Sequence, residues 1–292
     1  MGGENKWLGL AYVAPYIVGL LIFTAIPFGA SFYLSFTDYP LLQAPLWVGL
    51  QNYIDLIFHD RTFHKALQVT LTYVFITVPL KLTFALLIAY VLNYKLRFIG
   101  FFRTAYYVPS ILGGSVAIAV LWRYIFADIG LVNMIITGLG FEAVNFFGDP
   151  RYALFTITLL RVWQFGSAMV IFLAALQSIP THVYEAAAID GANTYQTLLF
   201  IDIPMLTPAI ISVCLFQFMW TMNDFLGPLI YISSVDKYPV SLALRLSLDV
   251  TEAFQWNQVL AMSALTLAPS LIVFFVAQRY FIEGISTGGV KG

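Results

Sequence analysis

Four polar side chains lie close together in an otherwise apolar stretch, and their types could hold a hydroxyl-rich solute. Gln217, Trp220 and Asp224 are spaced three and four residues apart, so a helix would place them on one face, with Asn223 beside them. Amides and carboxylates hydrogen-bond to hydroxyl groups, and a flat indole ring stacks on the C–H face of a sugar. The pattern therefore predicts candidate contacts to a polar solute at these positions.

A second apolar stretch carries Arg161, Trp163 and Gln164, which could face the same cavity. The alternative for all these residues is structural, because hydrogen bonds between membrane helices contribute about 0.6–2 kcal/mol each. Asp224 could also pair with Arg161 or Lys81, and for Asp224 we favour such an ion pair. Lys81 serves equally well as a packing or pairing residue and as a pathway residue.

Other kinds of chemistry find no support in the sequence. His59, His64 and His182 are scattered and lack the spacing of metal ligands. No nucleophile and base cluster together, and no Gly-x-x-x-x-Gly-Lys-Ser/Thr phosphate loop is present. We therefore predict no catalytic or metal site and no ATP hydrolysis by this chain, which we do not expect to be an enzyme.

The elements that position these residues are membrane helices. Of the 292 residues, 60% are hydrophobic and only 10% are charged, against about 25% in soluble domains. The net charge of −1 does not suggest nucleic acid as a partner. We predict an all-α integral membrane protein with six spans, at residues 10–36, 67–92, 104–126, 152–176, 205–232 and 254–281.

The orientation of these spans does not follow from charge. The lysines and arginines in the loops, in the terminal segments and near the span ends divide six to six between the two sides of the membrane. Only the short basic turn from Lys95 to Arg103 favours an N-terminus on the inner side.

A polar segment between the fourth and fifth predicted spans has the pattern of two short helices. Pro180 suits the start of a helix, Gly191 can take the left-handed conformation that ends one, and a second helix can follow from Thr194. Pro204 and Pro208 would then open the fifth span. The alternative is an amphipathic interfacial loop without a specific role.

The residue pattern of this segment is more specific than amphipathicity. It resembles the "EAA" signature of binding-protein-dependent ABC importer permeases. The matching positions are Glu185, Ala186, Ala187, Asp190, Gly191, Ala192, Ile201 and Pro204. The segment departs from the family pattern in Ile203, where leucine is usual, and in acidic Asp202, which could alter contacts with a partner.

The resemblance extends over nearly the whole chain. Ser35 to Tyr39, Gly49 to Tyr53 and Tyr107 to Pro109 look like permeases of the oligosaccharide-importer group, as does Trp220 to Phe225. The tail, with Gln278-Arg279-Tyr280 and a glycine-rich end, resembles one of two permease subunits in maltose-type systems. The front resembles the other subunit, so the sequence does not assign the chain to either.

The resemblance implies a mechanism and a division of the chain. Residues 1–66 would form an N-terminal span and external loop, 67–283 the permease domain, and 284–292 a cytoplasmic tail. The segment from Glu185 to Pro208 would be a cytoplasmic coupling helix–turn–helix that docks on an ATPase. There Glu185 would pair with a basic residue, the alanines would allow close packing, and Gly191 would permit the bend.

The resemblance also implies partners and a location. They are a second homologous permease, two ATPase copies that bind the ATP and Mg²⁺, and an extracytoplasmic solute-binding protein. The chain would lie in the inner membrane of a prokaryote with both termini in the cytoplasm, and would import a sugar or oligosaccharide. Two alternatives remain: another polar cargo such as glycerol phosphate, and an ATP-independent secondary transporter, which often shows inverted repeats with discontinuous helices that are not visible in this sequence.

Overall fold

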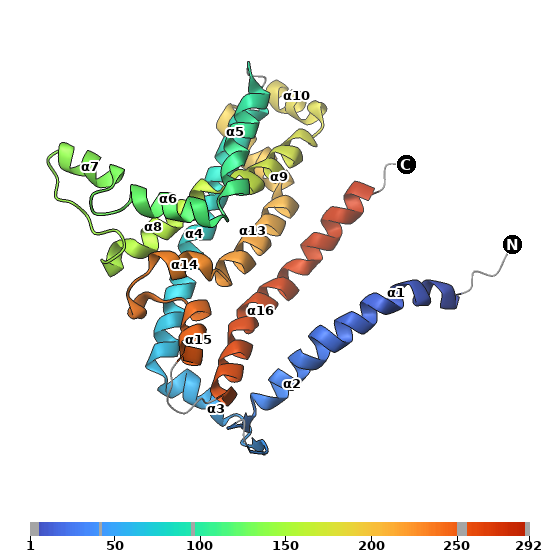
Figure 1. Cartoon of the computed structure of the whole chain (residues 1–292). Coiled ribbons are helices and arrows are strands. Elements are labelled where there is room, and N and C mark those ends of the chain that lie inside the picture. The colour runs from blue at the N-terminus through green and yellow to red at the C-terminus, as the bar shows by residue number, and fades with distance from the viewer. Residues whose placement is uncertain (1–5, 41–42, 95–96, 250–255, 290–292) are drawn as a thin grey trace. The chain divides into compact units, whose positions relative to one another are not determined.

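The computed structural model describes residues 6–40, 43–94, 97–249 and 256–289, and its elements are labelled in Figure 1. Lys95 of the predicted basic turn and the last three residues of the predicted tail lie outside this part of the chain. The described residues form two compact units, Met1–His64 with Leu244–Ala268, and Lys65–Ala243 with Pro269–Gly292.

The first unit begins with an apolar helix of three parts, α1 (Lys6–Leu20), the π-turn η1 (Leu21–Ala25) and α2 (Ile26–Leu34). Pro27 lies in the first turn of α2 and cannot donate a backbone hydrogen bond, and the helix widens to a π-turn directly before it. Strands β1 (Thr37–Asp38) and β2 (Leu46–Trp47) then pair antiparallel. Helix α3 (Gln51–Ile54) and the π-turn η2 (Asp55–His59) follow.

Asn52 links the segment from Gly49 to Tyr53, in which it lies, to the segment from Ser35 to Tyr39. Its Nδ2 donates to the backbone carbonyls of Ser35, at 2.8 Å, and Thr37, at 2.9 Å. Its Oδ1 accepts from Asn257 Nδ2 at 2.9 Å. Because Asn52 is buried, these bonds satisfy backbone groups at a sharp change of chain direction.

The second unit contains most of the remaining helices. They are α4 (Arg61–Asn93), α5 (Ile99–Leu112), α6 (Val116–Ile125), α7 (Leu131–Gly138), α8 (Pro150–Trp163), α9 (Gly166–Gln177), α10 (Thr181–Ile189), α11 (Thr194–Thr197), the π-turn η3 (Leu198–Asp202), α12 (Ile203–Met205), α13 (Thr207–Met222), α14 (Leu226–Tyr231), the 3₁₀ turn η4 (Val235–Lys237), α15 (Val240–Asp249) and α16 (Trp256–Gly289). Three of these helices, α4, α15 and α16, belong partly to the first unit, and α16 continues past the predicted end of the sixth span.

Among the described residues, three helices are each long and apolar enough to cross a membrane, namely Gly9–Leu34, Arg61–Asn93 and Trp256–Gln278. Three further pairs pass the same test only together, and the count reaches six if each pair is one span. α5 and α6 are bent by 100°, and α8 and α9 by 43°. Discontinuous helices, which were not visible in the sequence, are therefore present, because Gly113-Gly114 and Gln164-Phe165 interrupt two apolar stretches.

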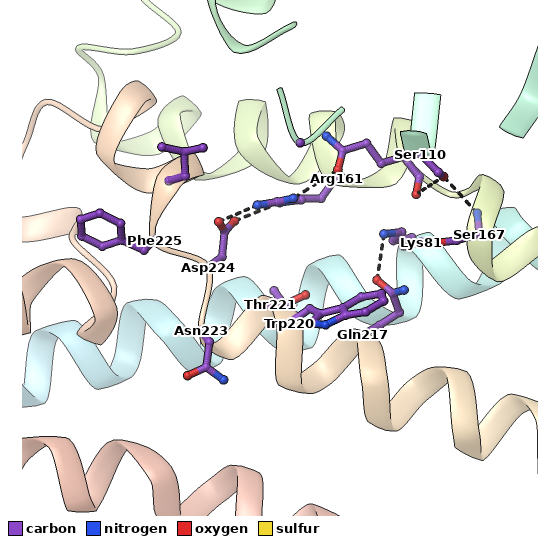
Figure 2. A pocket seen from close by; sticks show the side chains of 13 residues that line it. Lys81, Ser110, Arg161, Ser167, Gln217, Trp220, Thr221, Asn223, Asp224 and Phe225 are labelled. Carbon is purple, nitrogen blue, oxygen red and sulfur yellow. Dashed lines mark hydrogen bonds and ion pairs between the residues drawn. The ribbon is translucent and has the colours of Figure 1, made fainter. Parts of the chain in front are cut away.

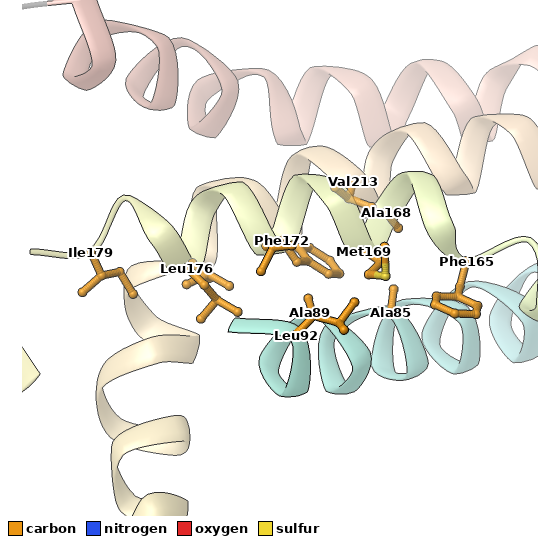
Figure 3. Close-up of a cluster of buried hydrophobic side chains, with 12 residues drawn as sticks. Ala85, Ala89, Leu92, Phe165, Ala168, Met169, Phe172, Leu176, Ile179 and Val213 are labelled. Carbon is orange, nitrogen blue, oxygen red and sulfur yellow. The ribbon is translucent and has the colours of Figure 1, made fainter. Parts of the chain in front are cut away.

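Small side chains bring α4 and α9 together. Ala85 and Ala89, four residues apart on α4, are fully buried, and Figure 3 shows them opposite Met169 and Phe172 of α9. Because each of these alanines has only a methyl group, the larger side chains of α9 can pack against α4, and such dispersion contacts favour helix association in lipid. This core fixes α9, whose first turn contributes to the cavity described below.

Candidate functional site

A cavity of about 510 Å³ lies within the second unit, where several helices are interrupted (Figure 2). Ser110 lies near the end of α5, and Gly114 follows that helix. Gln164 follows α8, and Ser167 lies in the first turn of α9. Asn223, Asp224 and Phe225 connect α13 to α14, which begins at Leu226. The other lining residues are Lys81, Arg161, Gln217, Trp220 and Thr221. A cavity at helix breaks has free backbone polar groups near it, as is typical of transporter binding sites.

Arg161 and Asp224 form a two-point ion pair beside the cavity, drawn in Figure 2. Arg161 Nε donates to Asp224 Oδ2 at 3.0 Å and Nη2 donates to Oδ1 at 2.5 Å. Tyr73 Oη donates to the same Oδ2 at 2.9 Å, and the Gly227 N–H donates to Oδ1 at 3.3 Å. The carboxylate is thus held by α4, α8 and α14, and the favoured sequence interpretation of an Asp224 ion pair has Arg161 as its partner.

Lys81 has a different environment from the arginine. Its Nζ donates to Gln217 Oε1 at 2.8 Å, across from α4 to α13. The lysine is only 7% exposed, and Gln217 is also buried. The partner that the structure gives to this ammonium group is therefore a neutral amide.

Six of the seven predicted pathway candidates line the cavity: Arg161, Gln164, Gln217, Trp220, Asn223 and Asp224. The seventh, Trp163, lies elsewhere, with its ring centroid 5.7 Å from that of Trp122. A helix turns by about 100° per residue, so Arg161 and Gln164 share a face while Trp163 points away from it. Trp163 is thus placed in a hydrophobic cluster rather than in the cavity.

Two serines of the cavity were missed in the sequence. Ser110 Oγ donates to the Gln164 carbonyl at 3.1 Å and accepts from the Ser167 N–H at 3.0 Å, so it bridges the broken end of α8 and the start of α9. The start of α9 can approach α5 this closely because residue 166 is a glycine. A Cβ at this position would lie 2.4 Å from the Tyr106 carbonyl oxygen. In the sequence, the pair Gly113-Gly114, which interrupts the third predicted span, was the signal that could have pointed to a helix break near Ser110.

The polar segment after α9 forms the predicted helix–turn–helix geometry. α10 ends at Ile189, Gly191 takes a left-handed φ of +76°, and α11 begins at Thr194. Asn193 and Gln196 form a capping box, with Gln196 N donating to Asn193 Oδ1 at 2.9 Å and Asn193 N donating to Gln196 Oε1 at 2.8 Å. Local backbone chemistry therefore fixes both the bend and the start of the second helix.

The acidic residue that departs from the family pattern faces inward. Asp202 is 1% exposed, and Tyr184 Oη donates to its Oδ1 at 2.8 Å. The two side chains tie α10 to η3 and line a small cavity of about 300 Å³ with Tyr90, Asn93 and Thr197. Asp202 therefore braces the segment from within and lies off its exposed face.

The exposed face of the segment is partly charged and partly apolar. Glu185, Ala186, Asp190 and Gly191 are exposed, Ala192 and Ile201 are partly buried, Ala187 is buried, and Pro204 is exposed. Large apolar side chains are exposed on the same segment, at Ile189, Tyr195, Leu199 and Phe200. Elsewhere, no group of three His, Cys, Asp or Glu side chains within the described residues could hold a metal ion.

Comparison with known proteins gives a consistent result. The chain is 42% identical over 280 residues to the probable ABC transporter permease protein YesP of Bacillus subtilis, covering 95% of this chain and 90% of YesP. It is 36% identical over 207 residues to the arabinooligosaccharides transport system permease protein AraP of the same organism, covering 69% of this chain and 64% of AraP.

The fold matches a solved structure as well. A chain of a bacterial ABC transporter involved in the import of the acidic polysaccharide alginate superposes with a TM-score of 0.79 at 22% identity, covering 98% of this chain and 97% of that one. Residues 65–287 match the family of binding-protein-dependent transport system inner membrane components. The chain therefore belongs to this family of ABC transporter permeases, which are transport components rather than enzymes.

Proposed function

We propose that the chain is one permease subunit of an ATP-driven importer and forms half of the pathway for a sugar or oligosaccharide. An extracytoplasmic binding protein would deliver the cargo, and a separate ATPase would dock on the segment from Glu185 to Pro208. The family description supports the binding-protein part of this proposal. The proposal of a saccharide cargo rests on the cavity, and the proposal of an ATPase contact rests on the segment from α10 to η3.

The exposed face of α10 to η3 has the composition of a docking surface. Ile189 is 86% exposed and Phe200 is 75% exposed, which is unfavourable for large apolar side chains that remain in water. Ala186 has only a methyl group, so a partner backbone can approach it closely. Glu185 adds an exposed carboxylate that a basic residue of the ATPase could pair with.

Helix α13 connects this surface to the cavity, and this geometry is the observation that carries the proposal. The helix begins at Thr207, five residues after Asp202, and ends at Met222, where the cavity residues Asn223 and Asp224 follow. Its 16 residues form a rod about 24 Å long. A displacement of the docking surface would therefore reach the cavity through a rigid element, as ATP-driven transport requires.

The cavity chemistry favours a saccharide. Trp220 is 63% exposed and offers a flat ring, while Gln217 and Asn223 supply amides for hydroxyl groups. The relative AraP is named for arabinooligosaccharide transport, which agrees with this chemistry. Each permease carries one α10–α11 segment, so a heterodimer with a second permease would dock two ATPase copies, which bind the ATP and Mg²⁺. With these segments on the cytoplasmic side, both termini would also be cytoplasmic.

Association with the ATPase tests the proposal. The chain is co-expressed with the second permease and the ATPase, and the amount of ATPase that copurifies is measured for the wild type, Glu185→Lys and Glu142→Lys. Glu142 is an exposed acid outside the segment and serves as the matched control. We expect Glu185→Lys alone to lose the ATPase. Equal recovery with all three would contradict the docking assignment, and transport without any ATPase would instead identify a secondary transporter.

A further inference from the structure

The cavity contains one buried cation without an anionic partner. Among the described residues that line it, the ionisable side chains are Lys81, Arg161 and Asp224. Two cations and one carboxylate leave a formal charge of +1 at this site. A charged group at membrane depth is costly and marks a functional site when no structural partner neutralises it.

Asp224 cannot serve both cations. A carboxylate has about four lone-pair positions, and the four donors already present are Arg161 Nε, Arg161 Nη2, Tyr73 Oη and the Gly227 N–H. The Asp224 side chain is only 3% exposed, so its carboxylate is enclosed by these donors. The aspartate is therefore committed to Arg161.

Lys81 keeps unused hydrogen-bonding capacity. An ammonium group has three donors, and the structure gives one of them an acceptor, Gln217 Oε1. Figure 2 shows Lys81 joined to Gln217, separately from the Arg161–Asp224 pair. The second residue of α9, Ser167, also lines the cavity, so the positive end of that helix dipole lies at the same site. Both features favour a negative group in the cavity.

We propose that the cargo is an acidic saccharide and that Lys81 binds one of its carboxylates. This inference rests on the proposed saccharide permease function, with Trp220 and Asn223 contacting the sugar ring. One unpaired ammonium group matches one carboxylate in charge. A phosphate carries about −1.5 to −2 charges at neutral pH and would need a second free cation, whereas Arg161 is already bound to Asp224.

The test uses the complete importer in proteoliposomes, with its binding protein and ATPase. The probes are uronate oligosaccharides of two to five units, each paired with the same oligosaccharide after its carboxylates have been reduced to alcohols. A sugar phosphate forms a third arm. Uptake is compared between the wild type, Lys81→Met, Lys81→Arg and Lys65→Met. Lys65 is an exposed lysine outside the cavity and serves as the control.

We expect Lys81→Met to lower uptake of an acidic probe at least tenfold and to change uptake of its reduced partner by less than twofold. Lys81→Arg should retain the preference, and Lys65→Met should match the wild type. The same binding protein is used with all variants, so a difference in uptake between them reports on the cavity. Retained uptake of the reduced probe shows that Lys81→Met is folded.

Three outcomes would overturn the inference. Equal loss of acidic and reduced probes in Lys81→Met would make Lys81 merely structural. If the wild type takes up the reduced probes or the sugar phosphate better than every uronate, the cargo is not selected for a carboxylate. In both cases the saccharide permease itself could still stand. Uptake of no saccharide, acidic or neutral, would overturn the proposed function together with this inference.

Discussion

Arg161 and Asp224, 63 residues apart in the sequence, meet in a two-point ion pair that closes one side of the cavity. Arg161 lies near the end of α8, and Asp224 lies in the connection from α13 to α14. The pair holds two helix ends, which have no continuous backbone to fix them, in one arrangement. It therefore gives a structural role to two of the residues that were candidates for cargo contact.

Replacing Arg161 should destabilise the second unit strongly. Arg161→Met leaves the buried Asp224 carboxylate without its cation, and such a loss costs about 3–5 kcal/mol. Denaturant unfolding in detergent measures the free energy. The control is Arg151→Met, which breaks the exposed pair with Asp149 and should cost at most about 1 kcal/mol. Similar losses for both variants would contradict the structural role of the Arg161–Asp224 pair.

Local signals explain how much of this arrangement was predictable. Gln217, Trp220 and Asp224 follow helix spacing, as do Arg161 and Gln164, so sequence alone predicts which of them share a face. The bend at Gly191 was equally predictable, because glycine adopts a left-handed φ without steric cost. These features depend on neighbours within one or two helical turns.

Contacts between distant residues were not predictable. Lys81 and its hydrogen-bond partner Gln217 are 136 positions apart in the sequence. Asp202 faces inward, where it meets Tyr184 from another helix. The 100° bend between α5 and α6 arises where a glycine pair permits it, but glycine alone does not specify an angle. Packing in three dimensions decides such features.

The glycine at the start of α9 should tolerate no side chain. In Gly166→Ala the new Cβ would lie 2.4 Å from the Tyr106 carbonyl oxygen and 2.8 Å from the Tyr107 Cα, so α5 and α9 must separate. Overpacking of this kind costs about 1–3 kcal/mol, measured by thermal unfolding. Gly138→Ala, where nothing lies within 4 Å of the new Cβ, is the matched control. An unchanged midpoint for Gly166→Ala would contradict the close approach of α5 and α9.

The brace between Tyr184 and Asp202 should matter for coupling more than for binding of cargo. Tyr184→Phe removes the donor to a buried carboxylate, which costs about 1–3 kcal/mol and should loosen α10 against η3. We expect faster hydrogen exchange in α10 and less uptake per ATP hydrolysed. Tyr124→Phe, at an exposed tyrosine outside the segment, is the control. If Tyr184→Phe and Tyr124→Phe behave alike, the brace has no part in coupling.

Asp149, the N-cap of α8, lies outside the predicted spans and should make the stability of the protein depend on pH. The Asp149 side chain accepts from the Arg151 N–H at 2.8 Å, and hydrogen bonds from the Arg151 side chain lower the pKa of Asp149 from 3.8 to about 2. A lowered folded-state pKa means that the charged cap stabilises the protein above the ordinary pKa. This contribution is lost as the pH falls from about 3.8 to about 2.

Thermal unfolding of the wild type and Asp149→Asn across this pH range measures the effect. The stability advantage of the wild type should shrink between these two pH values and be constant from pH 5 to pH 7. An advantage that does not change with pH would show that the charge of Asp149 is not what stabilises the start of α8.

ATP-dependent uptake tests the central claim most directly. The complex is reconstituted into proteoliposomes with the binding protein outside and ATP inside, using either the active ATPase or one that binds ATP without hydrolysing it. Radiolabelled saccharide is then measured in the lumen. The account predicts accumulation against the gradient with the active ATPase only, and none when Glu185→Lys prevents docking. Equal uptake with both ATPases, or uptake that survives Glu185→Lys, would contradict a pathway driven through α10, α11 and α13.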